Sequence, residues 1–142
     1  MTDYSGHIVL AYMGLRAAAH FADHWVQTDC QAQHKSLAGW VGRLACGRHV
    51  ATYVATQAVF VTLLFTQSGG SQHWWGLLYG LVLSGVTHYW ADRRSPLQKL
   101  AEKVGKGPFY KRGEILGSGA YALDQSWHHV WETVAAVLIA LN

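Results

Sequence analysis

Charged residues are scarce in this chain, and so are cysteine and proline. Lys, Arg, Asp and Glu make up 13% of the 142 residues, and none of them lies between Arg48 and Asp92. The two cysteines, Cys30 and Cys46, form no Cys-x-x-Cys pair, which argues against a thiolate metal site and a disulfide framework. The N-terminal region carries Asp3 rather than a cation cluster before an apolar run, so we expect a cytoplasmic protein without a secretory signal.

What the chain does contain is largely apolar and aromatic. Hydrophobic residues account for 51% of the sequence, with seven Trp and nine His, and the formal net charge is +3. The length fits one domain that buries roughly 70% of its unfolded surface. The modest basic balance favours an anionic small molecule or nucleotide as ligand, and nucleic acid is a further candidate partner.

Apolar residues recur at helical intervals, and strand-like alternation is scarce. Turn-forming residues and Pro96 divide the pattern into four main helices. We expect these at about 5–33 with a break near Thr28, 37–66 with a candidate division near Gly47, 72–92, and 120–141. The chain is thus predicted to be an all-α, single-domain helical bundle covering residues 1–142. Residues 96–119, rich in Gly and Lys, are predicted to form a mobile loop with a short helix near 97–104.

Two segments of the chain are about as long as a membrane-spanning helix. They cover residues 49–66 and 74–91, and both contain polar residues such as Gln57 and His88. Polar atoms inside a bilayer are costly unless neighbours satisfy them, so a buried core helix is the favoured interpretation. Membrane association remains the alternative to a cytoplasmic location.

Three helix-compatible stretches each place a His and an Asp within one turn of each other. The pairs are His20 with Asp23, His88 with Asp92, and Asp124 with His128. Residues three or four apart share a helix face, so each pair can aim both side chains at one point. Each pair alone is also explained by a structural salt bridge, such as one from Arg16 to Asp23. Together they favour a divalent metal, because unpaired buried carboxylates are costly.

The predicted ligands are nitrogen and oxygen atoms, which suit zinc or manganese best, and iron or nickel also fit. A metal-activated water would hydrolyse a substrate, with His49, His129 and Gln27 as candidate catalytic residues and His49 or His129 as the general acid. Basic side chains near the pairs are predicted to bind a phosphoryl group. These are Arg93, Arg94, Lys106, Lys111 and Arg112.

Several stretches of the sequence also carry a resemblance to a known family. They are His20-Phe-Ala-Asp23-His-Trp-Val-Gln27-Thr28, His49, Thr87-His88-Tyr-Trp-Ala-Asp92 and Leu123-Asp124-Gln125-Ser-Trp-His128. On these residues the chain resembles domain of unknown function 3307, a family of helical proteins of bacteria and phages, from about His20 to Leu141. The resemblance implies a helical fold and a polar centre, but no particular reaction. His24 stands where the family usually has an apolar residue.

The order of ligands on successive helices is also similar, more distantly, to the His-Asp phosphohydrolases. Those enzymes carry an adjacent His-Asp dipeptide, whereas the nearest arrangement here is His88-x-x-x-Asp92. The leading hypothesis is therefore a metal-dependent hydrolase of phosphoesters such as a nucleotide or oligonucleotide. The alternatives are a non-catalytic helical binding protein with a structural His/Asp network, and a membrane protein that uses the same polar centre for ions or protons.

Overall fold

The computed structural model describes residues 4–70, 73–113 and 117–141, and every regular element within them is helical. The predicted all-α fold is therefore confirmed. The elements are α1 (Tyr4–Phe21), the π-helical turn η1 (Ala22–Val26), α2 (Asp29–His34), α3 (Gly39–Gln67), α4 (Trp74–Asp92), α5 (Ser95–Lys103), α6 (Gly107–Tyr110) and α7 (Gly119–Leu141).

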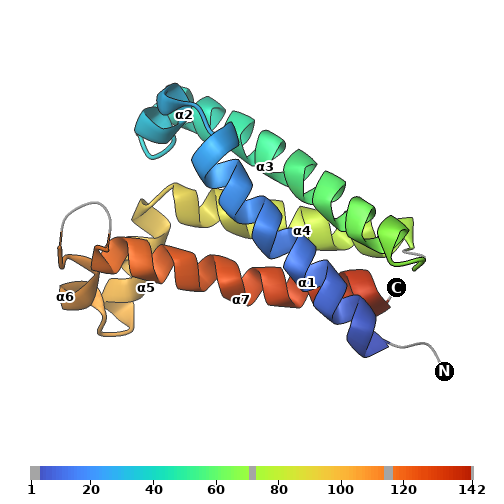
Figure 1. Cartoon of the computed structure of the whole chain (residues 1–142). Helices are drawn as coiled ribbons and strands as arrows, with labels where there is room; N and C mark the ends of the chain where they lie inside the picture. The colour runs from blue at the N-terminus through green and yellow to red at the C-terminus, as the bar shows by residue number, and fades with distance from the viewer. Residues whose placement is uncertain (1–3, 71–72, 114–116, 142) are drawn as a thin grey trace.

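The four long helices α1, α3, α4 and α7 form the body of the molecule (Figure 1). Helices α1 and α4 each pack against both α3 and α7. Their shared core contains small and branched side chains from all four helices, which permits close approach of the backbones. This core consists of Ala11, Leu15, Val61, Phe65, Leu81, Ala135, Ala136 and Ile139.

The short helices α2, α5 and α6 lie at the same end of the bundle, with α2 beside α3 and with α5 and α6 beside α7 (Figure 1). Ten of the eleven Lys and Arg residues are in these helices or in the adjoining parts of the chain, and Arg16 is the exception. We call this part of the molecule the basic end. Its cations are Lys35, Arg43, Arg48, Arg93, Arg94, Lys99, Lys103, Lys106, Lys111 and Arg112.

Most helix boundaries follow local signals in the sequence. The predicted break near Thr28 is confirmed, because Thr28 caps α2 in a capping box with Gln31. Pro96 lies in the first turn of α5, where its missing N–H costs no hydrogen bond. The candidate division near Gly47 is wrong, since α3 continues through it. The predicted start of the third helix at Gln72 lies outside the described residues.

The segment predicted as a loop, residues 96–119, contains α5 and α6. Helix α5 is amphipathic and buries Leu97 and Ala101, so this part of the chain is more ordered than its Gly and Lys content suggested. Residues 114–116 lie outside the described part. Movement of the segment over a ligand stays a prediction.

Close packing of α4 on α7 depends on Gly80. A Cβ atom at this position would lie 2.5 Å from Cγ1 of Ile139 and 2.9 Å from the carbonyl oxygen of Ala135. We expect Gly80→Ala to lower the free energy of unfolding by about 1–3 kcal/mol, because the helices must move apart. Gly47→Ala is the matched control, since a Cβ there meets nothing within 4 Å. Equal unfolding midpoints for the two variants in denaturant titrations would contradict this packing.

Candidate metal centre

Four side chains from three segments meet near the basic end of the bundle. Asp23 lies in η1, His49 in α3, and His88 and Asp92 near the end of α4. His49 is fully buried, and His88 and Asp92 are 1% and 5% exposed, whereas the Asp23 side chain is 18% exposed. The centre is therefore enclosed on all sides except the one formed by η1.

Local backbone geometry explains how these side chains come together. The π-helical turn widens α1 immediately before the chain bends at Thr28, which turns Asp23 toward α3 and α4. On α3, buried residues recur every three or four positions and include Cys46, His49, Tyr53 and Gln57. This inward stripe is polar at the level of Asp23 and becomes apolar further along the helix.

The ligand atoms of the four residues lie close to one another. His49 Nε2 is 3.0 Å from His88 Nε2, 3.2 Å from Asp23 Oδ1 and 3.3 Å from Asp92 Oδ2. His88 Nε2 is 3.1 Å from Asp92 Oδ2 and 3.7 Å from Asp23 Oδ1. Each of the two imidazole nitrogens therefore lies within 3.7 Å of both carboxylate oxygens, and we call the space between these atoms the common point. We call these four residues the donor set.

Within the described residues, the two carboxylate oxygens of the donor set accept no hydrogen bond in good geometry. Both Asp23 Oδ1 and Asp92 Oδ2 are buried without such a partner. If one Nε2 atom of His49 and His88 donates to the other, the single proton between them is not available to the two carboxylate oxygens. A cation at the common point would satisfy all four atoms at once. The Nδ1 atoms of both histidines also lack a partner, so the usual outer hydrogen bond of a ligating His is missing among these residues.

The distances between donors match those found around a first-row metal ion. Metal–ligand bonds of about 2.0–2.1 Å place tetrahedral ligands about 3.3–3.4 Å apart and adjacent octahedral ligands about 3.0 Å apart. The separations that involve the His49 or His88 nitrogen run from 3.0 to 3.7 Å. Mixed imidazole and carboxylate donors suit zinc or manganese better than calcium, which takes oxygen ligands alone.

The charge of the centre also favours a cation. Burial alone would raise the pKa of the Asp23 carboxyl, but the neighbouring imidazoles of His49 and His88 outweigh burial and hold that pKa below its usual value. Asp23 is therefore ionised at neutral pH. The other oxygen of Asp92 lies 2.9 Å from Lys35 Nζ. A structural salt bridge was the alternative interpretation for Asp92, and the structure provides one with Lys35. Among the described residues, Asp23 is then the carboxylate of the donor set without a Lys or Arg in contact.

His128 and Asp124, both predicted as ligands, form an adjacent layer. The His128 ring stacks on His88 with centroids 4.2 Å apart, and its Nε2 lies 3.4 Å from Asp124 Oδ2. Ligand atoms of His88, Asp92 and His128 lie within 4.8 Å of one another, so His128 is near enough to join the centre. Asp124 contacts His128 but not the donor set, so His128 lies between Asp124 and the donor set.

Behind this layer is a buried network that our sequence analysis did not assign to the site. Glu132 is 1% exposed and accepts hydrogen bonds from Tyr53 Oη at 3.0 Å and from Arg16 Nη1 at 3.2 Å. The expected alternative partner of Arg16 was Asp23, and the structure pairs Arg16 with Glu132 instead. Helical spacing could have identified both Glu132 and Tyr53. Glu132 follows His128 by four positions, and Tyr53 follows His49 by four, so each lies on the same helix face as a histidine of the site.

Three other predicted site residues lie outside the donor set. His20, predicted as a ligand, is exposed and places Nε2 2.6 Å from Arg16 Nη2. His129 is exposed on α7, so it is free to meet a substrate but does not contact the donor set. Gln27 follows η1 and buries its Nε2 without a partner among the described residues. His49, predicted as a general acid, is itself a member of the donor set.

The five cations predicted to bind substrate form no ion pair or hydrogen bond with the donor set in the described part of the chain. Arg93 donates to the carbonyl oxygens of Lys35 and Leu37, both at 2.6 Å, and thereby fixes the chain between α2 and α3. Lys111 pairs with Glu102 on the surface at 3.7 Å. The cation in contact with the donor set is Lys35, whereas Arg16 pairs with Glu132 in the network behind it. Phosphoryl binding by Arg93, Arg94, Lys106, Lys111 and Arg112 stays a prediction.

Comparisons with family models, curated proteins and solved structures found no match for this chain. The resemblances to domain of unknown function 3307 and to the His-Asp phosphohydrolases therefore stay predictions, and the functional argument depends on the geometry of the donor set.

Proposed function

We propose that the protein is a metal-dependent hydrolase that acts on phosphoesters. The observation that carries this proposal is the convergence of His49, His88, Asp23 and Asp92, with two buried carboxylate oxygens that accept no hydrogen bond from the described residues. A divalent ion bound there, with an open coordination position, would lower the pKa of water toward 7 and so supply a nucleophile at neutral pH.

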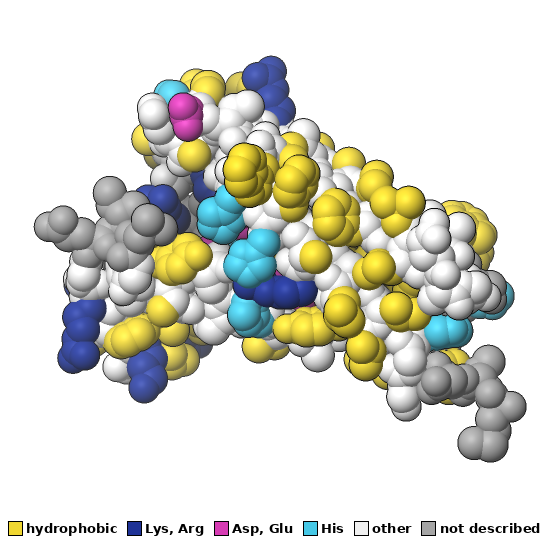
Figure 2. Space-filling view, viewed as in Figure 1, with side chains coloured by type: hydrophobic (Ala, Val, Ile, Leu, Met, Phe, Trp, Pro, Cys, Tyr) yellow, Lys and Arg dark blue, Asp and Glu magenta, His cyan; other side chains and the backbone are white. Residues whose placement is uncertain are grey.

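Access to the centre is from the side of Asp23, the most exposed member of the donor set. Figure 2 shows His side chains gathered at the middle of one face, with a basic side chain among them. The exposed His20 and His129 both lie near Arg16. An anionic substrate that approaches here meets Arg16 at the surface and the Lys35 ammonium beside Asp92, which supports the choice of a phosphoester. His129 remains our candidate proton donor to a leaving group.

Hydrolysis of bis(p-nitrophenyl) phosphate and of nucleotides tests this function. The protein loaded with zinc or manganese is expected to release product, and His49→Gln is expected to lower the rate at least about 100-fold because it removes a ligand. His73→Gln is the matched control, since His73 is exposed at the opposite end of α4 from His88 and should leave the rate unchanged. Metal-loaded protein without activity on phosphate mono- or diesters would contradict the proposed reaction.

A structural metal site is the second candidate, and one observation favours it. All four donors come from the protein and three of them are at most 5% exposed, as in closed structural sites. Such a site would tie η1, α3 and α4 together without catalysis. A protein that is stabilised by bound metal but hydrolyses no phosphoester would identify the site as structural.

A further inference from the structure

Large apolar side chains are exposed along the part of the bundle that is remote from the basic end. They lie on all four long helices and are 39–63% exposed, although a folded protein in water usually buries such groups. Figure 2 shows hydrophobic side chains over this part of the surface. The exposed residues are Val9, Met13, Val59, Leu63, Leu78, Val82, Val86, Val134 and Leu141.

This region also lacks charged residues. Residues 4–15, 50–70, 73–91 and 133–141 contain no Lys, Arg, Asp or Glu. We call these four segments the apolar half of the bundle. Arg16 and Glu132 border these segments as an ion pair at 3.2 Å, with side chains that are 18% and 1% exposed. All other cations belong to the basic end.

Two helices of the apolar half are long enough to cross most of the hydrocarbon core of a lipid bilayer. The charge-free stretches of α3 (50–67) and α4 (74–91) are each about 27 Å long at 1.5 Å per residue, close to the hydrocarbon core of about 30 Å. By length and composition, α3 is the one described helix that could cross a membrane, and only 28% of its most apolar stretch is buried. The core helix of a water-soluble protein would instead be mostly buried. Exposed Trp74 and Trp75 mark the end of α4 that is remote from the basic end, as in an interfacial aromatic belt.

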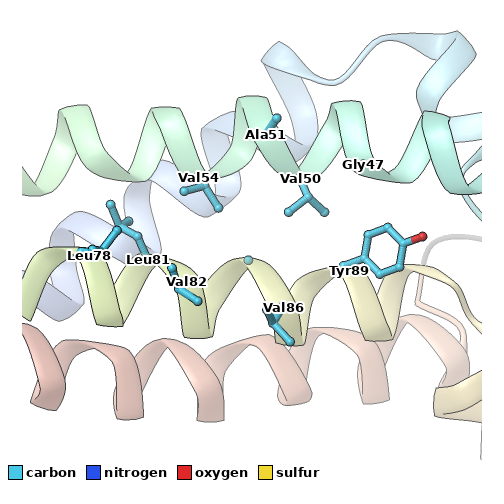
Figure 3. A pocket seen from close by; sticks show the side chains of 10 residues that line it. Gly47, Val50, Ala51, Val54, Leu78, Leu81, Val82, Val86 and Tyr89 are labelled. Carbon is cyan, nitrogen blue, oxygen red and sulfur yellow. The ribbon is translucent and has the colours of Figure 1, made fainter.

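A groove between α3 and α4 is also apolar throughout. It has a volume of about 600 Å³ and includes Val50, Val54, Leu78, Val82, Val86 and Tyr89 in its lining (Figure 3). Gly47 and Gly85 widen it, because neither presents a side chain. The absence of any charged lining residue leaves no site for an ionic ligand, and the shape suits a hydrocarbon chain.

We propose that the apolar half is embedded in a lipid bilayer, with an acyl chain in the groove between α3 and α4. The ten cations of the basic end then lie at the anionic cytoplasmic surface, in agreement with the excess of Lys and Arg on that side of membrane proteins. The donor set lies where the charge-free stretches of α3 and α4 end, so it is at the membrane boundary and opens toward the cytoplasm. This proposal does not depend on the metal centre or on the proposed reaction.

Synthesis of the full chain with vesicles of phosphatidylcholine and phosphatidylglycerol, followed by flotation in a density gradient, tests the proposal. The native chain is expected to float with the vesicles after an alkaline carbonate wash. The double variant Leu63→Lys/Val82→Lys places two cations on exposed positions of the apolar half and should reduce the floated fraction at least tenfold. Val104→Lys, equally exposed but in the basic end, should float like the native chain.

Three results would overturn the proposal. The native chain could remain below the vesicles, either as a soluble monomer or dimer or as an aggregate. Carbonate could release it, which would indicate a peripheral protein held by its cations alone. The double Lys variant could also float as well as the native chain, which would mean that Leu63 and Val82 do not face hydrocarbon. An acyl chain in the groove would be identified by lipid analysis of the detergent-purified protein.

Discussion

Asp23→Asn is expected to abolish metal binding and to lower the melting temperature by roughly 10 °C. An ion present at about 1,000 times its Kd stabilises the fold that binds it by about 4 kcal/mol, which corresponds to a shift of that size in a domain of this length. The substitution keeps the shape of the side chain but removes its negative charge. Asp92 already pairs with Lys35, whereas the Asp23 carboxylate contacts no Lys or Arg among the described residues, so its charge is the one available to a metal ion. Thermal unfolding of the purified protein in mild detergent, with and without a chelator, measures the effect.

The chelator provides an internal control for this prediction. Chelation should lower the melting temperature of the native protein to that of Asp23→Asn and should leave the variant unchanged. His20→Gln should behave like the native protein, because His20 contacts Arg16 and not the donor set. If the chelator destabilised Asp23→Asn as much as the native protein, Asp23 would not be a ligand.

Arg16→Met is expected to lower the free energy of unfolding by about 3–5 kcal/mol. The substitution leaves the Glu132 carboxylate, which is 1% exposed, with the Tyr53 hydroxyl as its remaining hydrogen-bond donor. An uncompensated buried charge is among the most costly single changes in a folded protein. Denaturant or thermal unfolding of the purified variant measures the loss.

A second variant separates this charge effect from lost packing. Glu132→Gln removes the charge and keeps the side chain's shape, so the double variant Arg16→Met/Glu132→Gln should recover a large part of the lost stability. Additive losses in the two single variants and the double variant would show that Arg16 and Glu132 do not stabilise each other.

Helix positions were largely predictable because the signals that set them are local. The capping residues at Thr28, the proline in the first turn of α5 and the helical recurrence of apolar residues each act within a few positions of the chain. The prediction at Gly47 was wrong because a glycine in a helix costs only about 1 kcal/mol, which tertiary packing overrides. The loop prediction for 96–119 gave too much weight to Gly and Lys and too little to the apolar face of α5.

The donor set was only partly predictable, because its assembly depends on how helices approach one another. Asp23, His88 and Asp92 were predicted as ligands from spacing within one helix, and the structure brings them close together. His20 precedes Asp23 by three positions and was predicted as a ligand on the same grounds. The π-helical turn directs Asp23 toward α3 and α4, whereas His20 points to the surface and contacts Arg16. The contact of Lys35 with Asp92 joins residues 57 positions apart and has no local signature.

X-ray absorption spectroscopy at the metal edge, on protein loaded with one equivalent of zinc, tests the central claim most directly. The donor set predicts nitrogen and oxygen neighbours at about 2.0–2.1 Å with the scattering of two imidazole rings, falling to one ring in His49→Gln and remaining at two in His73→Gln. A spectrum of the native protein without imidazole scattering, or one that His49→Gln leaves unchanged, would contradict a metal centre formed by these four residues.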